Sequence, residues 1–493
     1  MAVRQAQAAE RTNSAVGSQG FRSGLNPSAR RLTAFLYPLL ALLIPALTRA
    51  QAPAQDFEAL GKTLTVELSS RQFDKVEAQF DARMAEALPR EKLSTVWDQV
   101  LGQSGAFQRI TGTRLTEQQG YHIVFVTSEF EHATLDVKVV LDSSGHVAGL
   151  FFLPRSSSGQ SKSSGPSEPP ESTWSAPVYA KPSAFHEQQV TVGGGQWQLP
   201  GILTTPTGAG PFPAIALVHG SGPQDEDETI GPNKPFKDLA WGLASRGIVV
   251  LRYVKRTKEY AAQMIQNPAS ITVQEETIDD AQAAVTVLAA RREVDPHRIF
   301  VLGHSLGGTL APRIASEDPR VAGIILMAGG TRPLSRVIVD QIKYIASLKG
   351  QLTDAEKAQI AAVEQAAREI ESPTLKPTAI IEVLGSPTPG SYWLDLRAYH
   401  PAQVAAGLKI PILVLQGERD YQSTLEDFNG WKKALAGNPH VAFRLYPGLY
   451  HLFMPSTSPG NGPGTPADYN TPGHVSEQFI ADIAQWIQSG KLQ

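Results

Sequence analysis

The sequence predicts an α/β fold in which helices cover both faces of a mostly parallel, doubly wound sheet, preceded by a separate and smaller α+β domain. Short apolar runs alternate with helical stretches through the C-terminal part of the chain, which is typical of a parallel sheet. The N-terminal part instead combines helical stretches with strand-like alternation, and a stretch poor in apolar residues separates the two parts. At 493 residues the chain exceeds what one hydrophobic core usually supports, so two folded domains are expected.

Residues 1–52 are predicted to be an N-terminal extension with a signal peptide. Leu32–Leu47 is almost entirely apolar, Arg30-Arg31 precedes it, and Ala50-Gln51-Ala52 offers a small-residue cleavage site. The apolar run contains two prolines and is shorter than the roughly 20 residues that a membrane-spanning helix needs. We therefore expect export to the periplasm or the medium, with no membrane span after cleavage; an uncleaved membrane anchor is the alternative.

Residues 55–153 are predicted to form the small α+β domain. Helical periodicity runs over Phe57–Ser69 and Phe73–Leu101. Strand-like runs follow at Phe107–Thr113, His122–Phe130, Ala133–Leu141 and Val147–Phe152. This order predicts helices packed on an antiparallel sheet and resembles small domains of cystatin-like or NTF2-like shape. Three histidines are too irregularly spaced for a metal site, and surface or core positions are expected for His122, His132 and His146.

Residues 154–180 are predicted to be a flexible linker, and residues 181–493 the larger α/β domain. Ser156–Thr173 consists almost entirely of Ser, Gly, Pro, Lys, Glu and Gln, so it offers too little apolar surface to offset the entropy of ordering. Beyond it, helical stretches alternate with apolar strands that begin near Ala214, Ile248, Ile299, Val321, Ile412 and Val441.

A helical insertion interrupts this alternation and is predicted to be a cap at about residues 333–400. Pro333–Leu384 lies between two predicted strands and shows helical periodicity over Val337–Leu348 and Asp354–Ile370. A cap over the strand ends would enclose a pocket and exclude water from it. The alternative is a surface helical hairpin far from any site.

Gly303-His304-Ser305-Leu306-Gly307 is the strongest candidate for a catalytic motif. It fits G-x-S-x-G and follows the apolar run Arg298–Leu302, so it is typical of a nucleophile elbow between a buried strand and a helix. At such an elbow a bulky side chain in place of either glycine would clash with the neighbouring chain. The alternative is an ordinary strand-to-helix loop. Whether the motif is catalytic therefore depends on whether a suitable acid and base follow it in the chain.

A candidate acid and a candidate base follow later strands in the chain order that this chemistry requires. Asp420 comes shortly after the apolar run Pro411–Gly417, and His451 follows the run Val441–Tyr446. Ser305 would attack an acyl carbon, His451 would accept the serine proton and return it to the leaving group, and Asp420 would orient the imidazole. Three competing residues have weaker positions in the chain, namely His440, His474 and Asp395.

An oxyanion hole is predicted from two backbone N–H groups. One belongs to Leu306, directly after the nucleophile. The other comes from the loop His219-Gly220-Ser221-Gly222, which follows an apolar strand. The N–H of Ser221 is favoured and that of Gly222 is the alternative, although the His-Gly pair alone could be only a tight turn.

With these residues in view, Ala184–Trp486 resembles the α/β-hydrolases of the esterase and dienelactone-hydrolase-like group, in particular bacterial carboxylesterases with a small extra N-terminal domain. The motifs that carry the resemblance occur in order, namely His219–Asp225, Arg252-Tyr253, Gly303–Gly307, Gln416–Asp420 and Tyr446–His451. The resemblance implies hydrolysis of carboxylic esters, with thioesters also possible. Val254 departs from the acidic residue expected in such relatives, which puts a local ion pair in doubt.

The sequence gives no reason to expect a metal, a cofactor or a nucleic acid. The net charge of −3 offers no basic field for nucleic acid, and the absence of cysteine excludes disulfides and thiolate chemistry. The acidic run Asp225–Glu228 is expected to be solvated rather than to bind a cation, and His304 to pack or line the pocket rather than to transfer protons.

The best hypothesis from the sequence is a serine hydrolase whose partner is a small-molecule acyl ester. A serine peptidase or an acyltransferase or thioesterase could use the same residues. A catalytically silent fold used as a binding module is the alternative from another class. The oligomeric state and the acyl-chain length stay open.

Overall fold

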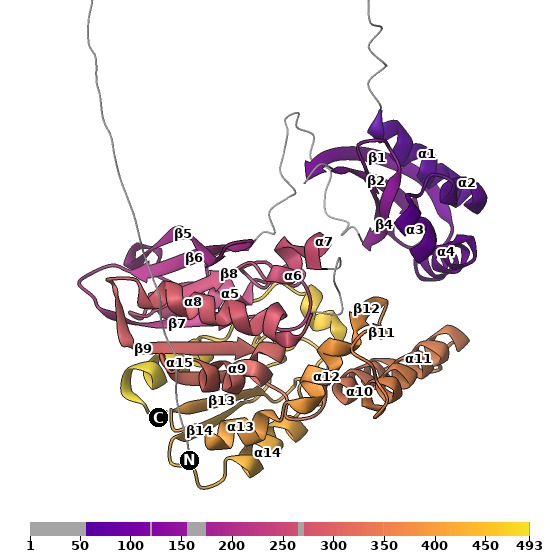
Figure 1. Ribbon diagram of the computed structural model, residues 1–493. Helices are drawn as coiled ribbons and strands as arrows, with labels where there is room; N and C mark the ends of the chain where they lie inside the picture. The colour runs from indigo at the N-terminus through magenta and orange to yellow at the C-terminus, as the bar shows by residue number, and fades with distance from the viewer. Residues whose placement is uncertain (1–55, 119–120, 155–173, 265–270, 349, 493) are drawn as a thin grey trace, which may run out of the picture. The chain divides into compact units, whose positions relative to one another are not determined.

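A computed structural model of the chain describes residues 56–118, 121–154, 174–264, 271–348 and 350–492 (Figure 1). The chain divides into two compact units, Met1–Ser164 and Gly165–Gln493. The predicted signal segment at 1–52 and the Ser156–Thr173 stretch of the predicted linker lie outside the described residues. Both therefore stay predictions.

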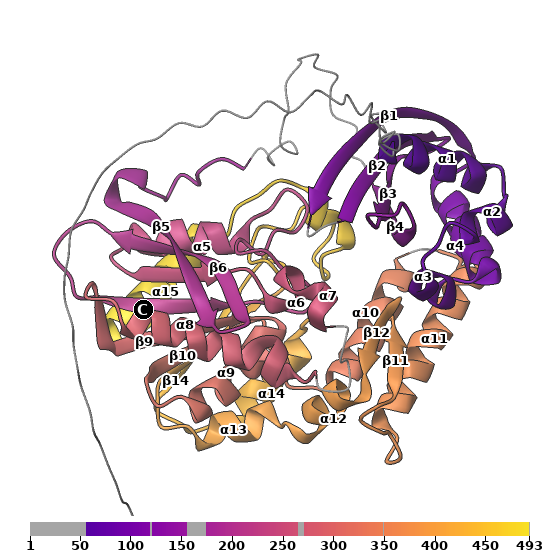
Figure 2. The ribbon, with the colours of Figure 1, turned by 45° about the horizontal axis from the view of Figure 1, so that its top comes forward.

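The described part of the N-terminal unit contains four helices followed by a four-stranded sheet. The helices are α1 (Phe57–Ser69), α2 (Phe73–Glu77), α3 (Ala82–Ala87) and α4 (Arg90–Ser104). The strands β1 (Phe107–Gln118), β2 (Tyr121–Phe130), β3 (Thr134–Leu141) and β4 (Val147–Pro154) pair antiparallel in chain order. Figure 2 shows the helices gathered on one side of this sheet. The predicted α+β class is confirmed.

The single helical stretch predicted over Phe73–Leu101 is wrong, because the chain forms three shorter helices there. The Asp81 side chain accepts a hydrogen bond from the Met84 N–H at 2.7 Å, so it starts a new helix. Pro89 then disfavours helical geometry at the residue before it and precedes α4. Trp97 of α4 is fully buried in the apolar core between helices and sheet.

An eight-stranded sheet forms the centre of the larger unit, with strand order β14-β13-β10-β9-β7-β8-β6-β5. The strands are β5 (Phe185–Gly194), β6 (Trp197–Pro206), β7 (Phe212–Val218), β8 (Val249–Tyr253), β9 (Val294–His304), β10 (Val321–Met327), β13 (Ile412–Gly417) and β14 (Val441–Tyr446). The six strands from β8 to β14 in this order run parallel, whereas β6 and β5 are antiparallel to their neighbours. The predicted mostly parallel sheet is confirmed.

Helices cover both faces of this sheet, as the doubly wound prediction requires. One face packs against α5 (Pro235–Ala244) and α15 (Glu477–Ser489). The other packs against α8 (Asp279–Ala289), α9 (Leu306–Glu317), α13 (Pro401–Gly407) and α14 (Leu425–Ala434). Short helical segments connect these elements, namely η1 (Pro182–Ala184), α6 (Arg256–Glu259), α7 (Ala261–Met264), η3 (Gln274–Ile278) and η4 (Pro466–Asn470).

A mainly helical segment between β10 and β13 forms the predicted cap. It consists of α10 (Leu334–Ser347), α11 (Asp354–Glu371), the hairpin β11 (Ile380–Val383) and β12 (Ser386–Pro389), and α12 (Gly390–Ala398). Both predicted helices are present, and α11 begins with a capping box between Thr353 and Glu356. The small hairpin was not predicted. Buried side chains from α11, β11 and α12 form a separate small core.

Candidate active site

Ser305 lies at a sharp turn between β9 and α9. Its backbone angles are φ 53° and ψ −114°, a conformation that residues other than glycine rarely adopt. Its N–H donates a hydrogen bond to the Met327 carbonyl oxygen at 2.8 Å, which ties the turn to the neighbouring strand β10. The sheet therefore holds the serine in a strained position at the end of its central strand.

The two glycines of the motif have a steric explanation. A Cβ atom on Gly303 would lie 2.0 Å from the Gly307 carbonyl oxygen. A Cβ atom on Gly307 would lie 2.3 Å from the Val218 carbonyl oxygen at the end of β7. Real Cβ atoms do not approach backbone this closely, so the turn around Ser305 is compatible only with glycine at both positions.

Asp420 and His451 lie in contact after the ends of β13 and β14. The Oδ2 atom of Asp420 is 2.7 Å from the Nδ1 atom of His451, and both side chains are buried. The Oδ1 atom accepts hydrogen bonds from the N–H groups of Gln422 and Ser423 at 2.7 and 3.1 Å. A carboxylate so fixed keeps the imidazole proton on Nδ1 and leaves Nε2 as the basic nitrogen.

The competing candidates lie elsewhere. Asp395 of α12 accepts a hydrogen bond from Arg313 at 2.8 Å. The Nδ1 atom of His474 lies 3.1 Å from Asp238, beside α15. His440 lies at the start of β14, next to a second, shallow pocket. None of the three is among the described residues that line the cavity around Ser305.

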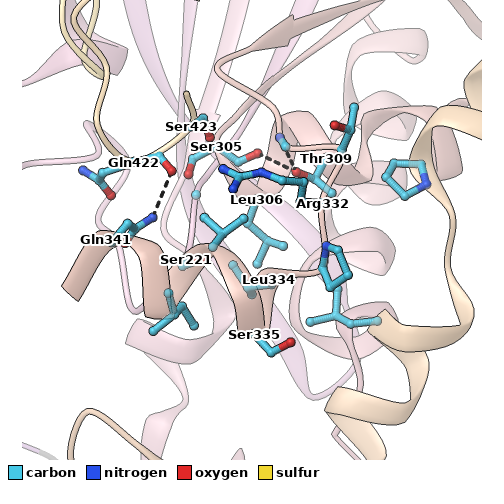
Figure 3. A pocket seen from close by; sticks show the side chains of 18 of the residues that line it. Ser221, Ser305, Leu306, Thr309, Arg332, Leu334, Ser335, Gln341, Gln422 and Ser423 are labelled. Carbon is cyan, nitrogen blue, oxygen red and sulfur yellow. Dashed lines mark hydrogen bonds between the residues drawn. The ribbon is translucent and has the colours of Figure 1, made fainter. Parts of the chain in front are cut away.

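Ser305 and His451 line one cavity of about 680 Å³ together with Ser221 and Leu306. Figure 3 shows this cavity, with Leu334 and Ser335 of α10 in its wall. The cap supplies much of the apolar lining, including Leu334, Val337, Ile338, Ile370, Trp393 and Leu396. The alternative of a surface hairpin far from the site is therefore wrong.

Hydrogen bonds attach the cap to the loop that carries the acid. The Nε2 atom of Gln341 on α10 donates to the Gln422 carbonyl oxygen at 3.2 Å, which Figure 3 marks with a dashed line. Arg332, just before α10, donates to the buried Asp427 carboxylate at 2.8 Å. The cap thus packs directly on the segment that holds Asp420.

The two groups predicted for an oxyanion hole belong to the wall of the same cavity. Leu306 is the first residue of α9, where the helix leaves the N–H groups without an internal acceptor. Ser221 lines the cavity, whereas Gly222 is not among the described lining residues. Gly220 lies so close to the nucleophile that a Cβ atom on it would be 3.1 Å from Cβ of Ser305.

Two residues whose role the sequence did not reveal, His304 and Glu228, form a buried ion pair next to Ser305 in the chain. The Nδ1 atom of His304 is 2.8 Å from Oε2 of Glu228, and its Nε2 atom is 3.1 Å from the His451 carbonyl oxygen. Both partners offer acceptor oxygens, so this environment favours the protonated ring. Burial lowers the pKa of His304, but Glu228 outweighs it and raises the pKa above its usual value.

The expectation that the whole acidic run is solvated is wrong for its second half. Asp227 and Glu228 are 4% and 1% exposed. Asp227 accepts a hydrogen bond from Arg252 at 2.8 Å, and Oε1 of Glu228 accepts one from the Gly220 N–H at 2.7 Å. These contacts exist because the run folds back on the strand ends. No group of three or more metal-ligating side chains occurs among the described residues.

Buried cationic residues lie at the end of β8, around Val254. The absence of an acidic residue at this position put a local ion pair in doubt, but the neighbours of Val254 form buried ion pairs of their own. Val254 is buried and pairs through its backbone with Pro200. The next residue, Lys255, is 2% exposed and lies 2.7 Å from Glu276. Its Nζ atom also donates to the Gly220 carbonyl oxygen at 2.8 Å. Charged residues after a strand ordinarily predict an exposed turn, so the sequence offered no signal for this burial.

In the described part of the chain, no helix is long and apolar enough to cross a membrane. The predicted apolar segment Leu32–Leu47 lies outside that part.

Two family models match the chain. A model described as a protein of unknown function (DUF3887) matches residues 62–150, and one described as serine aminopeptidase, S33, matches residues 234–456. Esterase EstD of Thermotoga maritima is 37% identical over 457 residues, which cover 93% of this chain and 99% of the relative. The likeness therefore spans both units.

Two solved structures illustrate similarity at lower identity. An esterase from Pyrococcus furiosus is 16% identical, with 62% of this chain and 91% of that one covered and a TM-score of 0.39. A structure described as a putative dienelactone hydrolase from Klebsiella pneumoniae is 18% identical, with 55% and 88% covered and a TM-score of 0.34.

Proposed function

Because the chain belongs to the α/β-hydrolase family of esterase EstD and is itself a serine esterase, we propose that Ser305, His451 and Asp420 hydrolyse its ester substrates through an acyl-enzyme. One observation carries this assignment. Asp420 contacts His451 at 2.7 Å, and His451 lines the same cavity as the strained Ser305.

In the first half of the reaction, Oγ of Ser305 attacks the ester carbonyl carbon while Nε2 of His451 accepts the serine proton. Asp420 stabilises the resulting imidazolium through Nδ1–H. The carbonyl oxygen becomes an oxyanion and accepts hydrogen bonds from the N–H groups of Leu306 and Ser221. When the carbon–oxygen bond to the alcohol breaks, His451 returns the proton to the leaving alkoxide.

In the second half, water repeats these steps on the acyl-enzyme. His451 accepts a proton from the attacking water, a second tetrahedral intermediate forms at the same oxyanion hole, and its collapse expels Oγ of Ser305. The carboxylic acid leaves, and the serine regains its proton from His451.

The cavity favours an ester over the α-amino group that an aminopeptidase recognises. A carboxylate without a cationic partner in the cavity wall would favour binding of a substrate ammonium group. The described wall contains two acidic residues, Glu228 and Glu371. Glu228 is paired with His304, and Glu371 with Arg336. The apolar cap residues instead suit an acyl or alcohol chain of several carbons.

We also propose that the chain is exported, because Leu32–Leu47 has the composition of a signal sequence. Mass spectrometry of the protein recovered from the periplasm or medium would then find an N-terminus close to Ala52. An intact N-terminus in the membrane fraction would contradict cleavage and favour an anchor.

Hydrolysis of p-nitrophenyl esters from acetate to laurate tests the assignment. We expect turnover by the parent and a loss of about a thousandfold or more in kcat for Ser305→Ala and for His451→Ala. His474→Ala is the matched control, since His474 also pairs with an aspartate but lies away from the cavity. Equal losses in the control, or full activity in His451→Ala, would contradict the assignment.

A further inference from the structure

The peptide bond between Gly220 and Ser221 is held from two sides. The N–H of Gly220 donates to Oε1 of Glu228 at 2.7 Å, which fixes the residue on its N-terminal side. The carbonyl oxygen of Gly220 accepts a hydrogen bond from Nζ of Lys255 at 2.8 Å. That carbonyl belongs to the same planar unit as the N–H of Ser221.

The lysine therefore sets the direction of the Ser221 N–H. In a trans peptide the C=O and the following N–H point to opposite sides. Ser221 lines the cavity, whereas Lys255 is 2% exposed and is not among the described lining residues. A carbonyl that points to Lys255 leaves the N–H directed toward the cavity. Within the described ranges, no protein group accepts a hydrogen bond from the Ser221 N–H.

The buried ammonium group of Lys255 is held in place by a counter-ion, Glu276. Glu276 lies 2.7 Å from Nζ of Lys255 and also accepts a hydrogen bond from the Tyr392 hydroxyl at 2.9 Å. A buried ammonium group is tolerated only when it is paired and hydrogen-bonded in this way. Glycine at position 220 permits many backbone conformations, so without the lysine the peptide could rotate and turn the N–H away.

We propose that Lys255, supported by Glu276, is a positioning residue that orients the Gly220–Ser221 peptide so that the Ser221 N–H donates to the oxyanion. Lys255 does not touch the substrate; it acts through the Gly220 carbonyl. Its charge also polarises the peptide unit and makes the N–H a stronger donor. This inference rests on the proposed ester hydrolysis at Ser305.

The double variant Lys255→Met with Glu276→Gln tests the proposal, because it removes both members of the pair and leaves no lone buried charge. We expect kcat for p-nitrophenyl esters to fall about 10- to 100-fold, since one oxyanion donor loses its alignment, with KM changed less than about threefold. A trifluoromethyl ketone, which forms a tetrahedral oxyanion adduct, is expected to bind more weakly by a similar factor.

The adjacent buried pair provides a matched control. Arg256 and Asp280 are buried and paired in the same way, one residue further along the chain. Arg256→Met with Asp280→Asn removes an equivalent pair and no contact with Gly220. We expect its kcat to stay within about threefold of the parent, because the oxyanion loop keeps its hydrogen bonds.

The following results decide the question. A kcat for the Lys255 double variant equal to that of the control, or a rise in KM alone, would overturn the proposal. Should the methionine variant fail to fold by circular dichroism, Lys255→Gln with Glu276→Gln replaces it, and its kcat must still fall below that of the control. Inactivity of the parent would instead contradict the ester hydrolysis itself, which keeps the two failures distinct.

Discussion

The two units of the chain place their charges differently. In the N-terminal unit the ion pairs lie at the surface: Arg71 with Asp98 and Arg90 with Asp74 have side chains that are half or more exposed. In the hydrolase unit the pairs at the carboxyl ends of the strands are buried, among them Glu228 with His304 and Lys255 with Glu276.

In the hydrolase unit, some of the buried pairs lie beside the proposed catalytic residues. Burying a charge pair brings little net stability, because the desolvation cost roughly cancels the attraction. A buried ion pair that holds backbone groups beside a candidate active site therefore indicates a role in positioning rather than in stability. Glu228 contacts the Gly220 N–H, and its partner His304 contacts the His451 carbonyl oxygen, so one pair connects the loop of Gly220, the turn before Ser305 and the loop of His451.

The largest expected effect comes from breaking that pair. Glu228→Ala leaves Nδ1 of His304 and the Gly220 N–H without their acceptor, so we expect the free energy of unfolding to fall by about 3–5 kcal/mol. Urea unfolding followed by tryptophan fluorescence measures it, because only Trp97 lies in Met1–Ser164.

Glu129→Ala is the matched control in the N-terminal unit. Glu129 also pairs with a cation, Arg109, at 2.7 Å, but the pair lies at the surface. We expect no resolvable change in its urea midpoint. Similar destabilisation by the two substitutions would contradict the distinction between the units.

A pH effect of intermediate size is expected from His219 of the oxyanion loop. Burial lowers its pKa from 6.5 to about 4. The unfolded chain then binds a proton at pH values where the folded chain does not, so stability falls as the pH drops from 6.5 toward 4. The total loss is on the order of 3 kcal/mol, at about 1.4 kcal/mol per pKa unit.

The comparison with His219→Gln isolates this contribution. Urea unfolding of both proteins at pH 7 and pH 5 gives the two slopes, and the variant is expected to lose less stability than the parent. His304 is present in both proteins, so its own contribution, a fall in stability as the pH rises above 6.5, cancels in the comparison. Identical slopes would contradict a neutral buried His219.

The smallest effect is expected from the surface pairs of the N-terminal unit. Arg71→Gln removes the contact with Asp98 at 2.7 Å, in which both side chains stay about half exposed. We expect the Tm to change by less than about 2 °C, and by still less in high salt, since water and salt screen such a pair. A larger shift in calorimetry would show that surface charge also supports this unit.

The sequence predicted most of the fold because apolar runs determine which strands are buried. All six strands proposed for the larger sheet are present, as are both cap helices. The edge hairpin of β5 and β6 was missed. The strand β5 is mostly polar and exposed, and the hairpin turns at Gly195-Gln196, so it lacks the continuous apolar run used to recognise the parallel strands.

The residues of the candidate site also fall into a group that the sequence predicted and a group that it did not. Ser305, Asp420 and His451 were predicted because each follows a recognisable strand. The buried pairs were not, since Glu228 and His304 are 76 residues apart and charged side chains ordinarily predict exposure. Only the folded sheet, which brings several strand ends to one edge, reveals that these charges meet.

The most direct test of the central claim is the site of covalent labelling. A fluorophosphonate probe is added to the full chain, and the labelled peptide is identified by mass spectrometry. The account predicts one adduct, on the peptide that contains Ser305, and none in Ser305→Ala. An adduct on another residue, or labelling that persists in Ser305→Ala, would contradict the assignment of Ser305 as the nucleophile.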